Sequence, residues 1–187
     1  MSQLSLAPPR IVRRSPVAVL LFLGLSVAAC SETTPRPTGT VCTTCGDCEQ
    51  DLPVESANHV LGTIDYPDPP PAGGDHNPCW TTWGVHMDVV QVERWVHNLE
   101  HGGVVYLYRD AAPDGGDDKT VTELTALVKE LPRTVLTQYA DLPKAYGVVV
   151  WGHRLVSDCM DEKAARDFYA KHFDQAPESI PDDPPCN

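Results

Sequence analysis

The spacing of apolar and polar residues predicts a mixture of short strands and helices. Apolar runs and alternations predict strands over residues 85–92, 104–108, 134–139 and 147–151, and residues 153–156 could continue the last of these after a bend at Gly152. Apolar residues three to four apart predict helices over about 120–131 and 161–173, and residues 93–100 predict a short helix or turn. Because strands and helices do not alternate regularly, we expect an α+β fold. Its small, mainly antiparallel sheet would have two flanking helices and long loops rich in proline and glycine.

The first thirty residues have the pattern of an export signal. Three arginines precede the apolar run 17–25, and small residues then lead to Cys30. The ending Val-Ala-Ala-Cys resembles a bacterial lipobox. This implies that residues 1–29 are a lipoprotein signal peptide and that Cys30 carries the lipid, whereas a plain secretory signal is the alternative. A lipid at Cys30 would hold the protein on the extracytoplasmic side of the cell envelope, on an outer membrane facing the periplasm or at the cell surface.

Composition divides the remaining chain into two parts. Residues 30–57 are rich in serine, threonine, proline and glycine, which is typical of a flexible tether, and this tether contains cysteines. Residues 58–187 are expected to form a single globular α+β domain that ends in a proline-rich tail.

Cysteine usage agrees with export. Six cysteines remain beside Cys30, and they are candidates for disulfides in an oxidising compartment: Cys42, Cys45, Cys48, Cys79, Cys159 and Cys186. Their connectivity does not follow from the sequence. The two-residue spacing of the first three could instead hold a soft metal ion through thiolates.

Charge restricts the partners of the chain. The 187 residues carry a net charge of -12, and this excess of carboxylates would repel a phosphate backbone. Nucleic acid is therefore excluded as a partner, and cations are favoured.

Candidate chemistry concentrates where four of the seven histidines fall, between residues 76 and 101. His97 and His101 are four residues apart and would share one face of a helical turn, so they could bind one metal ion. His76, in a Gly-Gly-Asp-His loop, is the expected third ligand, with nitrogens about 2.0–2.2 Å from the ion. Asp75 and Glu100 are expected to accept hydrogen bonds that orient the imidazoles.

Three further residues are weaker ligand candidates: His86, Met87 and Met160. Thioethers select copper, so the two methionines favour copper over zinc, which is the alternative ion. The histidines could instead satisfy polar groups in the core.

Several segments resemble a bacterial family known as domain of unknown function 3105. They are Gly-Gly-Asp-His-Asn-Pro at 73–78, Trp-Gly-Val-His at 83–86, Val-His-Asn-Leu-Glu-His-Gly-Gly at 96–103 and Val-Trp-Gly at 150–152. The similarity covers roughly residues 58–178. It implies an exported or membrane-anchored protein, with His76, His97 and His101 in the family signature. Tyrosine usually occupies the position of His86.

Three classes of function follow from these patterns. The first is an exported lipoprotein that binds a transition metal ion, copper before zinc, for storage, delivery or buffering. The second is a zinc-dependent hydrolase, because residues 97–101 match His-x-x-Glu-His with Glu100 as general base. The third is a non-catalytic structural or interaction module of the envelope. Gly102 and Gly103 would stop a helix directly after His101, which disfavours the hydrolase.

Overall fold

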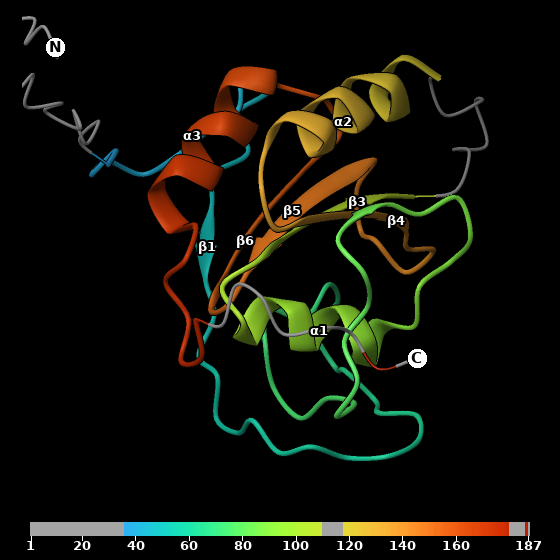
Figure 1. Cartoon of the computed structure of the whole chain (residues 1–187). Coiled ribbons are helices and arrows are strands. Elements are labelled where there is room, and N and C mark those ends of the chain that lie inside the picture. Colours follow the sequence, from blue (N-terminus) through green and yellow to red (C-terminus); the bar gives the residue numbers. More distant parts are fainter. Residues whose placement is uncertain (1–35, 110–117, 180–185, 187) are drawn as a thin grey trace, which may run out of the picture. The chain divides into compact units, whose positions relative to one another are not determined.

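The computed structural model of the protein describes residues 36–109, 118–179 and 186, which form a six-stranded sheet with helices on both faces (Figure 1). The strands are β1 (Gln50–Asp51), β2 (Gly84–Val85), β3 (Val104–Tyr108), β4 (Thr134–Gln138), β5 (Tyr146–Val150) and β6 (His153–Ser157). The helices are α1 (Val92–Glu100), α2 (Asp118–Glu130) and α3 (Glu162–His172). The strand order is β1-β6-β5-β3-β4-β2; β1, β6, β5 and β3 pair antiparallel, and β3, β4 and β2 pair parallel. The predicted α+β class with a mainly antiparallel sheet is confirmed.

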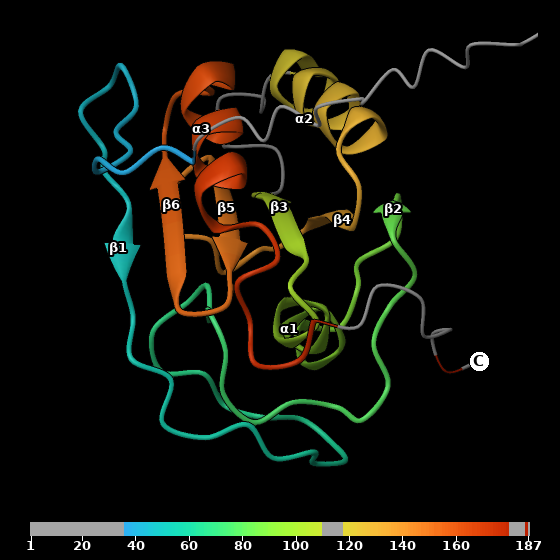
Figure 2. The ribbon, with the colours of Figure 1, turned by 60° about the vertical axis from the view of Figure 1, so that its left-hand side comes forward.

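Helices cover the sheet unequally. Figure 2 shows α2 and α3 on one face and α1 on the other. Side chains of β3 alternate between the two faces: Val104 and Tyr106 join the core beneath α2 and α3, whereas Val105 and Leu107 join the core beneath α1. The two helices predicted to flank the sheet are therefore joined by α1, the segment expected as a short helix or turn, which carries His97 and Glu100.

The strand predicted over 85–92 is wrong. Only Gly84–Val85 pair with β4, and Val92 already begins α1. Between them, Met87 is 80% exposed and Val89 is 66% exposed. Apolar character alone suggested a strand there, but these side chains have no sheet face to cover.

The described part of the expected tether, residues 36–57, packs onto the domain. Val41 is buried in the core, and β1 pairs with β6. The Glu49 carboxylate lies 2.8 Å from Nε2 of His172 on α3 and also pairs with Lys171. This segment is therefore part of the folded unit. Cys30 and the expected signal peptide lie outside the described residues.

All six candidate cysteines form disulfides, which confirms that expectation. The pairs are Cys42–Cys48, Cys45–Cys159 and Cys79–Cys186. The first closes a small loop, the second fastens that loop to the end of β6, and the third ties the C-terminal tail to the loop before α1. The cysteine sulfurs are therefore committed to bridges and leave the thiolate metal site without ligands. Within the described residues, no helix is long and apolar enough to cross a membrane.

Candidate metal centre

A backbone bridge brings His59 and His76 side by side. These residues form an isolated parallel bridge, in which Val60 N–H donates to the His76 carbonyl and His76 N–H donates to the Asn58 carbonyl. The Asp75 carboxylate accepts from Asn58 through both its backbone N–H and its side-chain amide, at 2.9 and 3.0 Å. The hydrogen bonds from Asn58 lower the pKa of Asp75, so this carboxylate stays ionised. Asp75 thus fixes the bridge that brings the two imidazoles side by side.

Helix α1 supplies the facing side chains. His97 and Glu100 lie three residues apart on its buried side, and His101 caps its C-terminus. The helix ends in two backbone bonds, from Gly102 N–H to the Leu99 carbonyl and from Gly103 N–H to the Asn98 carbonyl. This is a Schellman motif, and Gly102 has the left-handed φ of 77° that it requires.

Contacts of two tryptophans and an asparagine hold the C-terminal end of α1 in place. A Cβ at Gly103 would lie 2.5 Å from the Trp83 ring, so only glycine permits that close packing. The Asn98 amide both accepts from Thr81 N–H and donates to the Thr81 carbonyl, at 3.0 and 2.9 Å. Trp80 is buried, with its ring centroid 4.0 Å from that of His101. Trp80 therefore shields the imidazole of His101 from water.

Four side chains converge on one point. A ligand atom from each of His59, His76, His97 and Glu100 lies within 4.8 Å of the others. Glu100 Oε2 is 3.0 Å from His76 Nε2 and 3.7 Å from His59 Nε2. His76 is fully buried, and His97 and Glu100 are nearly so, whereas the His59 side chain is 48% exposed. The cluster is buried on three sides and reaches the surface at His59.

Backbone carbonyls fix the tautomers of the two buried imidazoles. His76 Nδ1 lies 2.8 Å from the Gly74 carbonyl oxygen, and His97 Nδ1 lies 2.7 Å from the Asn77 carbonyl oxygen. A carbonyl oxygen can only accept, so each Nδ1 carries a proton and each ring directs its Nε2 toward the cluster. In His97 this Nε2 also accepts a hydrogen bond from His101 Nε2–H at 2.7 Å. Carbonyl-oriented imidazoles of this kind are typical of metal ligands.

The Nε2 atom of His76 and Oε2 of Glu100 are a pair of acceptors that face each other. They lie 3.0 Å apart, yet both are buried without hydrogen-bond geometry to any partner. Two buried lone pairs at this distance repel, and each unsatisfied group costs about 1–3 kcal/mol. A cation between them, either a proton or a metal ion, removes that penalty. The donor set of three imidazoles and a carboxylate therefore fits a transition metal ion.

A proton competes only weakly with a metal ion for the imidazole of His97. Burial, together with the neighbouring histidines, lowers the pKa of His97 to about 4, although the hydrogen bond to Asn77 opposes this shift. His97 is consequently neutral at physiological pH, so a metal ion would compete for its Nε2 with the hydrogen bond from His101 rather than with a proton.

The model of the family described as "Protein of unknown function (DUF3105)" matches residues 59–184. The chain belongs to this family. No curated protein and no solved structure matches it. The DUF3105 match begins at His59, so the family region contains the whole cluster.

The expected three-histidine site of this DUF3105 member is only partly reproduced. His76 and His97 lie together, with ring centroids 4.7 Å apart. His101 lies beside His97, with the two Nε2 atoms 2.7 Å apart, and is not among the four converging ligands. Glu100 occupies a ligand position, whereas it was expected only to orient an imidazole. Asp75 was expected to do the same, but it binds Asn58, and backbone carbonyls orient the rings.

The weaker candidates lie elsewhere. His86 follows β2, and its Nε2 is 2.7 Å from the Thr82 carbonyl oxygen. Met87 is exposed, and Met160 packs against the core beneath α2 and α3, on the sheet face opposite α1. The structure therefore places neither thioether in the cluster.

Sequence reasoning missed His59. It stands alone at the start of the domain, seventeen residues before His76, and only a long-range backbone bridge brings the two together. The only indication in the sequence was one more histidine near the start of the domain.

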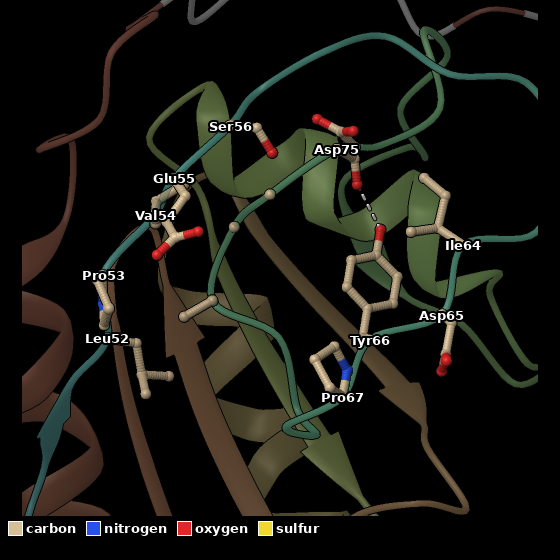
Figure 3. A pocket seen from close by; sticks show the side chains of 13 residues that line it. Leu52, Pro53, Val54, Glu55, Ser56, Ile64, Asp65, Tyr66, Pro67 and Asp75 are labelled. Atoms are coloured by element: carbon tan, nitrogen blue, oxygen red, sulfur yellow. Dashed lines mark hydrogen bonds between the residues drawn. The ribbon is translucent and has the colours of Figure 1, made fainter.

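A pocket of about 340 Å³ adjoins the cluster without forming part of it (Figure 3). It is lined by residues 52–56, 64–67 and 72–75, none of which is a histidine. Inside it, the Tyr66 hydroxyl donates to the Asp75 carbonyl oxygen at 2.7 Å. That hydrogen bond steadies the peptide that leads directly into His76.

Proposed function

We propose that the protein is an exported lipoprotein that binds a transition metal ion through His59, His76, His97 and Glu100, in storage, delivery or buffering. The observation that carries this proposal is the pair of buried acceptors, His76 Nε2 and Glu100 Oε2, which face each other without a hydrogen bond. Buried polar atoms are normally paired, so an unpaired couple within a cluster of imidazoles indicates a place for a cation.

Copper is the favoured ion. Imidazole and carboxylate ligands suit Cu(II) and Zn(II), and the stability order of divalent ions places Cu(II) above Zn(II) for a given site. Because the thioethers of Met87 and Met160 do not reach the cluster, the donor set favours Cu(II) rather than Cu(I). Zinc is the alternative.

The exposed edge of the cluster favours exchange of an ion over its use as a purely structural centre. Three ligands are buried and preorganised, while the half-exposed His59 provides the edge at which an ion can enter and leave. The net charge of -12 raises the local concentration of cations. A lipid at Cys30 would keep this exchange at an envelope membrane.

Binding is favoured over zinc-dependent hydrolysis because of Glu100. A general base must hold a water molecule beside the ion, whereas this carboxylate lies among the ligand atoms, 3.0 Å from His76 Nε2. A hydrolase would also need an open coordination position next to it.

The proposal is tested by metal content. The purified full chain is equilibrated with Cu(II) or Zn(II), dialysed and analysed by mass spectrometry for bound metal. The wild type should retain at least one equivalent, and His59→Ala should weaken binding by at least about tenfold, since it loses a ligand. His59 is half-exposed, so this variant should fold.

The matched control is His86→Ala, which removes a histidine outside the cluster and should bind as the wild type does. A wild type that retains no metal, or equal losses in both variants, would return the histidines to a structural role. Hydrolysis of a peptide or ester that is lost in Glu100→Gln with metal still bound would replace binding with the zinc hydrolase.

A further inference from the structure

We infer that the centre holds a second metal ion, bound by Glu100, His101 and Glu178, with Glu100 bridging the two ions. This inference rests on the proposed function, because it shares Glu100 with the first site. Ligand atoms of these three residues all lie within 4.8 Å of one another. His101 was expected at a metal centre, and Glu178 comes from the segment after α3.

The backbone holds Glu178 against the end of α1. Its N–H donates to the carbonyl oxygen of Glu100 itself, at 3.1 Å. Four residues earlier, Asp174 N–H donates to the Gly102 carbonyl at 3.0 Å, and the Asp174 carboxylate pairs with Arg133 at 2.6 Å. Arg133 also donates to the His101 carbonyl at 2.9 Å. The segment is therefore fastened to α1 and to Arg133, and Glu178 is kept next to His101.

Glu100 is the residue that links the sites. It is 4% exposed, and its Oε2 is buried without a hydrogen bond. A carboxylate has two oxygens and can offer one to each of two ions, which in such centres lie about 3.5–4 Å apart. The neighbouring imidazoles of His97 and His101 then serve one ion each.

The two sites differ in chemistry. The first site has three imidazoles and one carboxylate, whereas the second has one imidazole and two carboxylates. Because carboxylates are harder ligands than imidazoles, the second site binds late first-row metal ions less tightly. Glu178 is also exposed, so the second ion should exchange with solvent more readily. The carbonyl end of α1 carries partial negative charge, which favours a cation at this position. Two ions should therefore bind in sequence, first at the histidine-rich site and then at Glu178.

Titration with Cu(II) tests the second site. The full chain is titrated by calorimetry, and each step is followed by electron paramagnetic resonance. The first equivalent should give the spectrum of an isolated Cu(II) ion. The second should bind at least about tenfold more weakly and should broaden or reduce that spectrum, because the two ions would lie about 4 Å apart.

Glu178→Ala should retain one equivalent with an unbroadened spectrum, since the residue is exposed and its loss spares the fold. Glu55→Ala, which removes another exposed glutamate, should still bind two. Saturation of the wild type at one isolated ion would overturn the second site and leave the proposed function intact. Two coupled ions in Glu178→Ala would also overturn this assignment, and no binding by the wild type would overturn both proposals.

Discussion

Replacing Glu100 with glutamine should have opposite effects on the metal-free and the metal-bound protein. In the metal-free protein, the carboxylate oxygen and His76 Nε2 are facing acceptors. A glutamine amide places an N–H donor in that position and can bond to the His76 lone pair. Glu100→Gln should therefore stabilise the metal-free protein. The same change removes an anionic ligand, so it should weaken metal binding.

The size of each effect follows from the contacts. Satisfying buried polar groups that now lack a partner should add about 1–3 kcal/mol to the free energy of unfolding of the metal-free protein. Metal at one hundred times its dissociation constant should add about 2.7 kcal/mol to the wild type. If the variant binds one hundredfold more weakly, its gain falls below about 0.5 kcal/mol. For a domain of this size, each kcal/mol corresponds to about 2–4 °C in Tm.

The assay is thermal unfolding, followed by circular dichroism with a chelator and then with Cu(II). Glu93→Gln is the matched control. Glu93 is also buried on α1, but its carboxylate accepts a hydrogen bond from Ile64 N–H at 2.9 Å. Its replacement weakens a charge-assisted bond, so it should lower the metal-free Tm and leave the metal-induced increase unchanged.

The reasoning would be refuted if Glu100→Gln lowered the metal-free Tm as Glu93→Gln does. That result would mean that Glu100 stabilises the fold as an ion pair with His76. An unchanged metal-induced increase in Glu100→Gln would likewise remove Glu100 from the ligand set.

Three other measurements examine the neighbourhood of the centre. Acidification of the metal-free protein from pH 6.5 to 4 should lower its free energy of unfolding by up to about 3 kcal/mol through His97. Burial lowers the pKa of His97 to about 4, so the unfolded chain binds that proton first. Urea unfolding should show a flatter pH dependence in His97→Gln. Gly103→Ala should lower stability by about 1–3 kcal/mol, because its Cβ would lie 2.5 Å from the Trp83 ring, and a Tm equal to that of the wild type would contradict this packing. Replacing Cys79 and Cys186 together should cost about 2–4 kcal/mol in urea unfolding, whereas unchanged stability would show that this bridge does not constrain the chain.

The sequence predicts the centre of the sheet well because its signals are local. Continuous apolar runs identify β3 and β5, which are buried on both faces between α1 and the other two helices. β1 gives no such signal, since Gln50 and Asp51 are exposed and pair with β6 only at the sheet edge. The attachment of residues 36–57 depends on that pairing and on the disulfide to Cys159, neither of which has a local pattern.

The residues of the candidate site also differ in how well the sequence predicts them. His97 and Glu100 could be placed on one helix from their spacing, and the Gly-Gly-Asp-His loop identified His76. The role of Glu100 could not be predicted, because periodicity does not show which partner a helical side chain meets. His59 reaches the cluster through its bridge to His76. Glu178 reaches it through a turn after α3, and neither contact is encoded locally.

Anomalous diffraction from crystals of the metal-loaded chain tests the central claim most directly. Data collected at the absorption edge of the bound metal should show a peak about 2.0–2.2 Å from the Nε2 atoms of His76 and His97, with His59 and Glu100 completing its coordination. A second, weaker peak beside Glu178 would agree with the bridged centre. A peak elsewhere on the chain, or none between His76 and Glu100, would contradict the account.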